Sequence, residues 1–415
     1  MAQGFFGIGG GSRPATTITP EQAAFIAGTQ ELMNNPPEVS LPFGNTIVQT
    51  INGALTYTRA SETGNVNLSG VSETLLADKI AITKDGVSIY GEHTNEIEYS
   101  EDFSEPVWAK PAVTVNSGVT DSPEVGVLAD ELVSNDSVAR YVQQAAGFLE
   151  GDIVYTTIKI KKSVSDSVTF RVVSSSAPFM TYTFSTDTFS ISGTAVFSRE
   201  LLANGWVELK IAYTMTADTN VNMRMHCGDN ASPVVGDSVY VWGGQLSLID
   251  GPYIKTTTAP ATRGADKAYI PMMNSLPAPG SPFTIVIDSA DIPTSLTTNA
   301  FLWSGDALFY ARRQVASGAI QFATGSGTAT TASNFDTSSG VKFAFVYDGV
   351  NAMIYANGLQ VAISASGTPV YNLNNNLSIG SYYTFIQPVN TELKGLEVYH
   401  YALSENAALA LGAAS

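Results

Sequence analysis

The chain has 415 residues and a net charge of −17; 44% of its residues are hydrophobic and only 14% are charged. This length predicts two or three domains, and the low charged fraction predicts a surface built from Ser, Thr, Asn and Gly, as in β-rich extracellular proteins. The acidic charge disfavours nucleic acid and anionic membranes as partners, and no apolar run approaches the ~20 residues of a membrane span, so membrane insertion is not expected.

Residues 1–45 predict an anchoring arm. Their first 18 residues are rich in Gly and carry an apolar cluster that cannot fold alone but can dock on a partner. Thr19 to Gln22 is typical of a helix start, with an N-cap threonine, a proline at N1 and a capping-box glutamine. The helix is expected to end at Asn34-Asn35-Pro36-Pro37. The docking residues are predicted to be Phe5, Phe6, Ile8, Phe25 and Ile26. The alternatives are a disordered tail and a simple packing helix.

Residues 46–99 predict a short β connector. Two β-branched runs, 47–51 and 54–58, flank Asn52-Gly53, and this dipeptide between such runs predicts a tight hairpin. Two more short strands are expected within residues 74–90.

Residues 100–270 alternate apolar and polar positions in successive runs, the clearest being 154–160, 167–173, 206–213, 221–226 and 238–242. This period of two is typical of half-buried strands, and several such strands predict a two-sheet sandwich or jelly roll. Trp206 and Trp242 lie in these runs and are expected in the core. Cys227 beside His226 is expected to be a small buried residue rather than half of a metal site.

Residues 271–280 predict a Pro-rich linker, and residues 281–415 predict a second sandwich. Its clearest strands are 283–287, 343–347 and 352–356, with Asp348-Gly349 and Asn357-Gly358 as turns. A short C-terminal helix is expected over 405–411, capped by Ser404. The fold class is therefore predicted to be all-β: two jelly-roll or sandwich domains, preceded by a short β connector and an N-terminal arm with one helix.

Two groups of motifs resemble a module of bacteriophage tail-fibre and head-fibre proteins. LTYTRAS at 55–61, NEIEYSEDFS at 95–104 and VWAK at 107–110 are similar to its pattern FTRAS … TNLLxYSEDFSNxxWxK. VWGGQL at 241–246 and ATRGAD at 261–266 are similar to its ending. Glu96-Ile97-Glu98 departs from the usual Leu-Leu. The resemblance implies a carbohydrate-binding-module-like jelly roll over residues 100–270.

A third group looks like a concanavalin or laminin-G sandwich. It comprises FAFVYDG at 343–349, YANG at 355–358, LSIGS at 377–381, KGLEVY at 394–399 and ALS at 402–404. This resemblance implies a fold for residues 281–415 rather than a particular ligand.

Together the resemblances imply a virion protein, made in the bacterial host cytoplasm, that serves as a short tail fibre or head fibre. Its N-terminus would anchor to phage capsid, portal or tail proteins, and its sandwiches would bind host-surface polysaccharide. The lack of a secretory signal and of disulfides fits this origin. A capsid decoration protein and a glycan-degrading tailspike are the alternatives. A homo-oligomer is expected, with a trimer as the usual state of phage fibres.

No nucleophile elbow, P-loop or zinc motif is present in the sequence, so no catalytic residue and no enzyme activity is predicted. Aromatic residues in loop-like stretches suit sugar stacking. The predicted ligand surface is Trp303, Tyr310, Arg312, Tyr382, Tyr383 and Phe385. Residues 92–105 hold six carboxylates without the spacing of a calcium loop, which favours a solvated acidic edge. A structural calcium is the alternative, and no other cofactor is expected.

Overall fold

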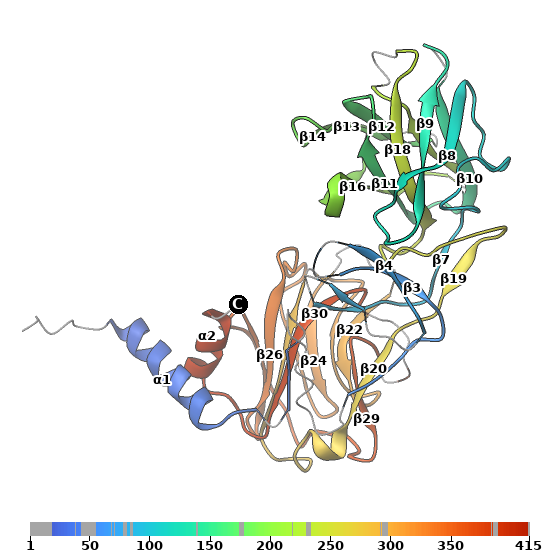
Figure 1. Cartoon of the computed structure of the whole chain (residues 1–415). Coiled ribbons are helices and arrows are strands. Elements are labelled where there is room, and N and C mark those ends of the chain that lie inside the picture. Colours follow the sequence, from blue (N-terminus) through green and yellow to red (C-terminus); the bar gives the residue numbers. More distant parts are fainter. Residues whose placement is uncertain are drawn as a thin grey trace, which may run out of the picture.

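The computed structural model describes residues 19–37, 39–42, 55–67, 69, 71–77, 81–83, 86–137, 140–173, 178–217, 219–229, 234–290, 292, 298–382, 384 and 389–413. These residues form two β-sandwiches, one stacked on the other, with a pair of helices at the side of the C-terminal sandwich (Figure 1). The all-β fold class is confirmed. None of the described helices is long and apolar enough to cross a membrane.

The first sandwich is a jelly roll made of two antiparallel sheets. The five-stranded sheet has the order β10 (Tyr141–Phe148), β17 (Thr219–His226), β12 (Ser167–Val173), β13 (Phe179–Thr183) and β14 (Thr188–Ser192). The six-stranded sheet has the order β15 (Val196–Leu201), β16 (Trp206–Thr214), β11 (Ile153–Lys162), β18 (Ser238–Ser247), β9 (Leu128–Ser134) and β8 (Val113–Asp121). Alternation decides which side chains meet between the sheets: on β11, Ile158 and Ile160 enter the core while Lys159 faces outward.

The second sandwich also has two sheets. Its larger sheet has the order β28 (Leu359–Ala365), β27 (Asn351–Ala356), β26 (Val341–Tyr347), β21 (Phe283–Ser289), β30 (Thr391–Tyr399), β6 (Gly86–Ile89) and β5 (Ile82–Thr83), with β1 (Val39–Pro42) also paired to β30. The facing sheet has the order β2 (Thr56–Thr58), β20 (Lys267–Pro271), β29 (Asn376–Ile379), β22 (Ala300–Ser304), β23 (Phe309–Arg313), β24 (Ile320–Thr324) and β25 (Thr328–Thr330). Aromatic rings packed edge to face around Phe283 and Trp303 fill the space between the two sheets.

The C-terminal sandwich takes strands from outside the range predicted for it. β1, β2, β5 and β6 come from the arm and connector, and β20 comes from the end of the jelly-roll range. Of the predicted connector, β3 (Thr63–Val66) with β4 (Ser72–Leu75) forms a separate hairpin, and β7 (His93–Asn95) pairs with β19 (Ala261–Arg263). The boundaries at 99 and 281 therefore do not follow the sheets, because these pairings join distant segments and leave no local pattern. The turn predicted at Asn52-Gly53 lies outside the described residues.

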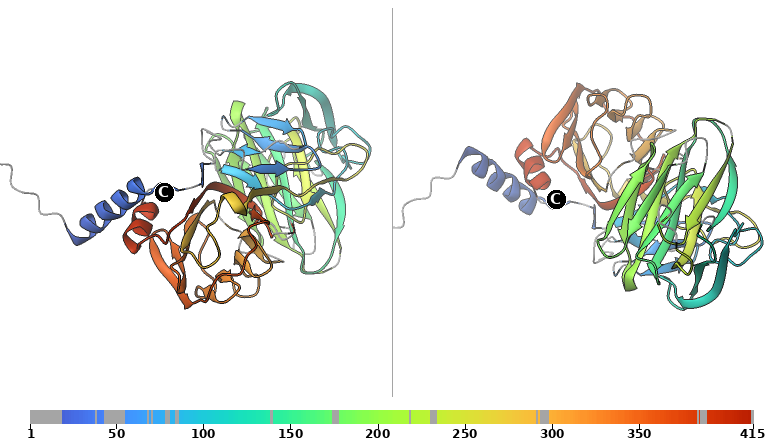
Figure 2. Two further views of the ribbon diagram at one scale, coloured as in Figure 1. Left: turned by 90° about the horizontal axis from the view of Figure 1, so that it is seen from below. Right: turned by 90° about the horizontal axis from the view of Figure 1, so that it is seen from above.

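Helix α1 (Pro20–Asn34) begins as the sequence predicts. Thr19 Oγ1 accepts from the Gln22 amide, and Gln22 Oε1 accepts from the Thr19 amide, so the capping box is complete. The helix lies beside α2 (Glu405–Ala413), as both views in Figure 2 show. A Cβ on Gly28 would lie 1.9 Å from the Asn406 carbonyl oxygen, so only glycine permits this approach. α1 is therefore a packing helix on one side.

A buried ion cluster ties the connecting strand β19 to the C-terminal sandwich. Asp266 accepts two hydrogen bonds from Arg263 Nη2, at 2.7 and 2.6 Å, and lies 3.5 Å from Arg59 Nη1. It also accepts from the Tyr57 hydroxyl and, at 2.8 Å, from the Tyr90 amide. Arg59, Arg263 and Asp266 are all at most 1% exposed. The two Thr-Arg motifs that resemble the phage module thus meet at one carboxylate, although they lie about two hundred positions apart in the chain.

Replacing Asp266 by Asn should destabilise the protein strongly, because two buried guanidinium groups would lose their counter-charge. Removing one partner of a buried ion pair costs about 3–5 kcal/mol, and we expect a loss of that size in urea unfolding. The matched variant is Asp187→Asn, which breaks a half-exposed pair with Arg199 and should cost less than about 1 kcal/mol. Equal effects of the two variants would contradict a special role for the cluster.

The outer face of the five-stranded sheet holds His226. The ring is 4% exposed and neither nitrogen has a hydrogen-bond partner among the described residues. Burial, followed by the charges of Arg224, Arg171 and Arg140, lowers the pKa of His226 to about 3. The neighbouring Cys227 is buried in the core, as predicted, and burial raises its pKa to about 12.

His226 should make the fold acid-sensitive. Between pH 6.5 and about 3 the unfolded chain binds a proton at this ring and the folded chain does not, so stability falls as the pH is lowered. We expect the stability lost between pH 7 and pH 4 to be smaller by roughly 2–3 kcal/mol in His226→Asn. Urea unfolding at both pH values measures this difference. Equal losses in the variant and the parent chain would contradict this role of His226.

Candidate functional site

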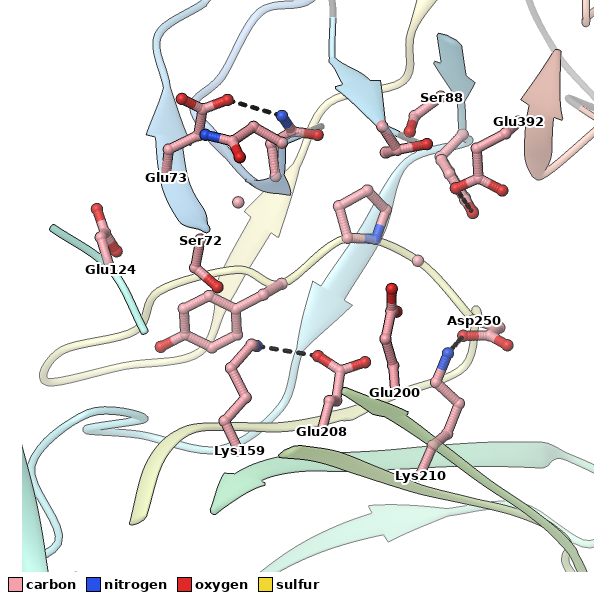
Figure 3. A pocket seen from close by; sticks show the side chains of 18 of the residues that line it. Ser72, Glu73, Ser88, Glu124, Lys159, Glu200, Glu208, Lys210, Asp250 and Glu392 are labelled. Atoms are coloured by element: carbon pink, nitrogen blue, oxygen red, sulfur yellow. Dashed lines mark hydrogen bonds and ion pairs between the residues drawn. The ribbon is translucent and has the colours of Figure 1, made fainter. Parts of the chain in front are cut away.

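A pocket lies where the jelly roll meets the β3–β4 hairpin and the C-terminal sandwich (Figure 3). It encloses about 180 Å³, which is small beside the ~300–1,000 Å³ of drug-sized sites and suits a ligand of about one sugar ring. Its floor is the outer face of the six-stranded sheet, through residues of β11, β15, β16 and β18. The other walls come from β3, β4, β6, β30 and the loop 250–253.

An aromatic wall stands on one side of this pocket. Lys159 and Trp242 are opposite each other on β11 and β18, and both face away from the core. The Lys159 ammonium lies 5.3 Å from the Trp242 ring centroid and 4.5 Å from that of Tyr253. The two rings are themselves 5.1 Å apart. The wall is thus fixed by cation–π contacts before any ligand arrives.

Two buried polar atoms on pocket-lining residues have no partner. Trp242 is 1% exposed, and its indole Nε1–H donates to no described atom. Ser72, on β4, is 5% exposed, and its hydroxyl likewise has no hydrogen bond among the described residues. Figure 3 shows the Ser72 hydroxyl directed toward the space between the walls. A buried polar atom left unpaired costs roughly 1–3 kcal/mol, so a ligand that pairs these atoms gains from both.

The pocket is acidic. Six carboxylates and two lysines line it: Glu73, Glu124, Glu200, Glu208, Asp250, Glu392, Lys159 and Lys210. Lys159 lies 3.1 Å from Glu208, and Lys210 pairs with Asp250. Burial alone would raise the pKa of Glu208, but Lys159 and Lys210 hold it below its usual range. Burial would lower the pKa of Lys210, but Asp250 and Glu208 hold it above its usual range. The excess of negative charge disfavours an anionic ligand.

Within the part of the chain that the structure describes, no three His, Cys, Asp or Glu side chains come together as a metal site. The structural calcium considered for residues 92–105 stays a prediction.

The predicted ligand surface comes together only in part. Tyr310, Arg312 and Tyr382 gather around Phe301: the Arg312 guanidinium lies 4.8 Å from the Tyr310 ring centroid, and the Phe301 and Tyr382 centroids are 4.6 Å apart. Trp303 is not with them, because it is fully buried against Phe309, Phe322 and Phe345. Tyr383 and Phe385 lie outside the described residues.

A β-bulge explains the misplacement of Trp303. Simple alternation would put Trp303 on the same outer face as Phe301, two residues earlier. The register of β22 against β23 shifts between these two residues, so that Leu302 and Trp303 both enter the core. Trp303 therefore offers no ring face to a ligand, and the sequence carries no signal for this bulge.

The structure describes only two of the five predicted anchoring residues. Phe25 and Ile26 lie on α1 and are 42% and 44% exposed, so their side chains are open to a partner. Phe5, Phe6 and Ile8 lie outside the described residues.

Sequence reasoning missed the pocket and assigned Trp206 and Trp242 to the main core. Both are buried, but they form a small separate cluster on the outer face of the six-stranded sheet. The available signal was Lys159, a lysine that alternates with Ile158 and Ile160 and so had to share the outer face with its cross-strand neighbours.

Comparison with known proteins assigns the C-terminal sandwich. Residues 276–407 match the family model described as the Concanavalin A-like lectin/glucanases superfamily. This part of the chain is a concanavalin A-like domain. A search of curated proteins finds no match to the chain.

Solved structures give only weak likenesses. Domain 4 of AbnA, a GH43 extracellular arabinanase from Geobacillus stearothermophilus in complex with arabinotriose, is 15% identical, with 39% of this chain and 80% of that chain covered at a TM-score of 0.28. Mouse laminin α1 domains LG4-5 are 11% identical, with 76% and 92% covered and a TM-score of 0.24. Trypanosoma rangeli sialidase is 10% identical, with 73% and 61% covered and a TM-score of 0.27. Scores of this size show no shared overall arrangement.

Proposed function

We propose that this chain binds glycans without hydrolysing them, and that the pocket beside the concanavalin A-like domain holds a neutral or amino-bearing sugar. The observation that carries this proposal is the pair of buried, unpartnered polar atoms, Trp242 Nε1 and Ser72 Oγ, on residues that line the pocket. Sugar hydroxyls can pair with both atoms, and a sugar's C–H face suits the half-buried Tyr253 ring. The acidic lining supplies further acceptors for hydroxyl and ammonium hydrogens.

Hydrolysis is the second candidate, because Glu200 and Glu208 are opposite each other on β15 and β16 and both line the pocket. Glycosidases use two carboxylates, one of which must keep its proton at neutral pH through a raised pKa. Lys159 and Lys210 hold the pKa of Glu208 below its usual range, so Glu208 could serve only as the ionised carboxylate of such a pair. Binding is the better supported activity, because it requires only the unpartnered donors and no proton-bearing carboxylate.

Ser72→Ala tests the pocket with little risk to the fold, because it removes a hydroxyl that has no internal partner. Affinity for neutral oligosaccharides, first selected on a glycan array and then measured by calorimetry, should fall about five- to tenfold, the equivalent of one hydrogen bond. Stability in urea should stay within about 0.5 kcal/mol of the parent chain.

Ser247→Ala is the matched control, because the Ser247 hydroxyl donates to the Ile249 carbonyl and lies outside the pocket lining. It should lose stability and keep its affinity. Unchanged binding in Ser72→Ala, or release of reducing sugar from a bound oligosaccharide, would contradict the proposal.

We further propose that the chain is a bacteriophage virion appendage, a short tail fibre or head fibre, that displays these sites to host-surface polysaccharide. The support is the resemblance of residues 55–61, 95–110 and 241–266 to fibre modules, together with the exposed Phe25 and Ile26 on α1. Capsid, portal or tail proteins would be its partners and a trimer its assembly. A capsid decoration protein with a mainly structural role is the alternative, which imaging of the particle distinguishes by location.

The anchor can be tested by replacing Phe5, Phe6, Ile8, Phe25 and Ile26 with Ser. Since Phe25 and Ile26 are over 40% exposed, folding of the sandwiches should be unaffected, while incorporation into purified particles should be lost. Leu359→Ser, at an exposed apolar position on β28, is the control and should incorporate normally. Normal incorporation of the five-residue variant would show that the arm is not the anchor.

A further inference from the structure

The five-stranded sheet of the jelly roll differs in charge from the rest of the chain. The whole protein has 37 Asp and Glu residues, yet none lies in β10, β12, β13, β14 or β17. The charged residues of these strands are Arg171 and Arg224, and both face away from the core. An acidic protein thus presents one locally cationic sheet face.

The two arginines lie side by side in the centre of that face. Arg171 on β12 and Arg224 on β17 are directly opposite each other, and Gln143 and Phe179 flank them in the same row across the sheet. The Arg224 guanidinium lies 3.8 Å from the Tyr141 ring centroid, and its Nε donates to Gln143 Oε1 at 2.7 Å. The Arg171 guanidinium lies 5.7 Å from the Phe179 centroid. Both head groups are therefore positioned without an acidic partner.

The two facing arginines lower the stability of the folded protein. Like charges directly opposite on neighbouring strands repel each other. Burial, and then the charge of Arg171, hold the pKa of Arg224 below its usual value although the Tyr141 ring opposes this. Among the described residues, neither arginine has a carboxylate within ion-pair distance. Arg171 Nε and both ring nitrogens of His226, which lies on the same face, are buried without partners. Packing alone gives no reason for two facing arginines here.

We propose that this sheet face binds an acidic polysaccharide, with Arg171 and Arg224 clamping the carboxylate of a uronic acid-type residue. A planar guanidinium matches a carboxylate with two parallel hydrogen bonds, and the absence of competing acids leaves these donors available. The amides of Gln143 and Asn222 and the hydroxyl of Thr181 lie on the same face and suit the sugar hydroxyls of an extended chain. The proposal goes beyond the pocket, because this face lies across the jelly-roll core from it and selects the opposite ligand charge.

Calorimetric titration of the full chain with oligogalacturonate, dextran and dextran sulfate at 0.15 M salt tests the proposal. Oligogalacturonate should bind, and dextran should not bind at this face. Dextran sulfate should bind no more tightly than oligogalacturonate. Tighter binding of dextran sulfate, or equal binding of single-stranded DNA, would show a general polyanion surface and overturn carboxylate recognition. No binding of oligogalacturonate would also overturn it.

Variants locate the site. Arg171→Gln and Arg224→Gln should each weaken oligogalacturonate binding at least tenfold, as expected for a lost charge-assisted hydrogen bond. Arg171→Gln should also unfold at the same or higher urea concentration, because it removes the repulsion. Arg199→Gln changes the same charge on the six-stranded sheet, where Arg199 pairs with Asp187, and should leave affinity unchanged.

Ser72→Ala distinguishes binding at this sheet face from binding in the pocket. It should leave oligogalacturonate binding unchanged whether or not the pocket binds neutral sugars. Full affinity in Arg171→Gln, or an equal loss in Arg199→Gln, would overturn the assignment of this face.

Discussion

The carboxylate of Asp266 is the point on which the packing of the connecting strands against the C-terminal sandwich depends. Arg59 follows β2, Arg263 ends β19 and Tyr90 follows β6, so one buried carboxylate joins a connecting strand to both sheets of the C-terminal sandwich. Arg263 Nε also donates to Thr63 Oγ1 at 2.9 Å, which places the β3–β4 hairpin. Because that hairpin carries Ser72 and Glu73, the ion cluster indirectly sets one wall of the pocket. Inside a low-dielectric junction such a cluster tolerates few geometries, which makes it a source of fixed orientation rather than of net stability.

Much of the fold could be predicted from the sequence, because the period of two is a local property. The runs at 154–160 and 167–173 are strands β11 and β12, and the capping box at Thr19 is the true start of α1. What could not be predicted is non-local. β20 follows the jelly roll in the sequence but pairs with β2 and β29 of the other sandwich, and only tertiary contacts select those partners.

The candidate site shows more clearly that sequence patterns do not predict contacts between distant segments. Alternation correctly removes Lys159 from the core, but it cannot say what covers the outer face. Trp242 was expected in the core since it is large and apolar; it is buried by Tyr253 and Lys159 on the outer side instead. The bulge in β22 turns the Trp303 side chain into the core for a related reason. One register shift changes the face on which the next residue lies without changing the composition of the strand. Sequence patterns thus predict burial better than they predict the side on which burial occurs.

The jelly roll separates two electrostatic environments across a single apolar core. Its six-stranded sheet borders a pocket with six carboxylates, and its five-stranded sheet carries two arginines and no acid. A ligand chosen by charge could therefore occupy only one of the two faces, so the proposed sites would not compete for the same sugar. Surface polysaccharides commonly mix neutral and acidic residues. Once the protein has bound one kind of residue, it meets the other kind at a high effective concentration, and this strengthens the overall binding. Trp242 and Lys159 on one sheet and Arg171 and Arg224 on the other belong to the same jelly roll, so its fold fixes the span that a polysaccharide must cover to engage both sites.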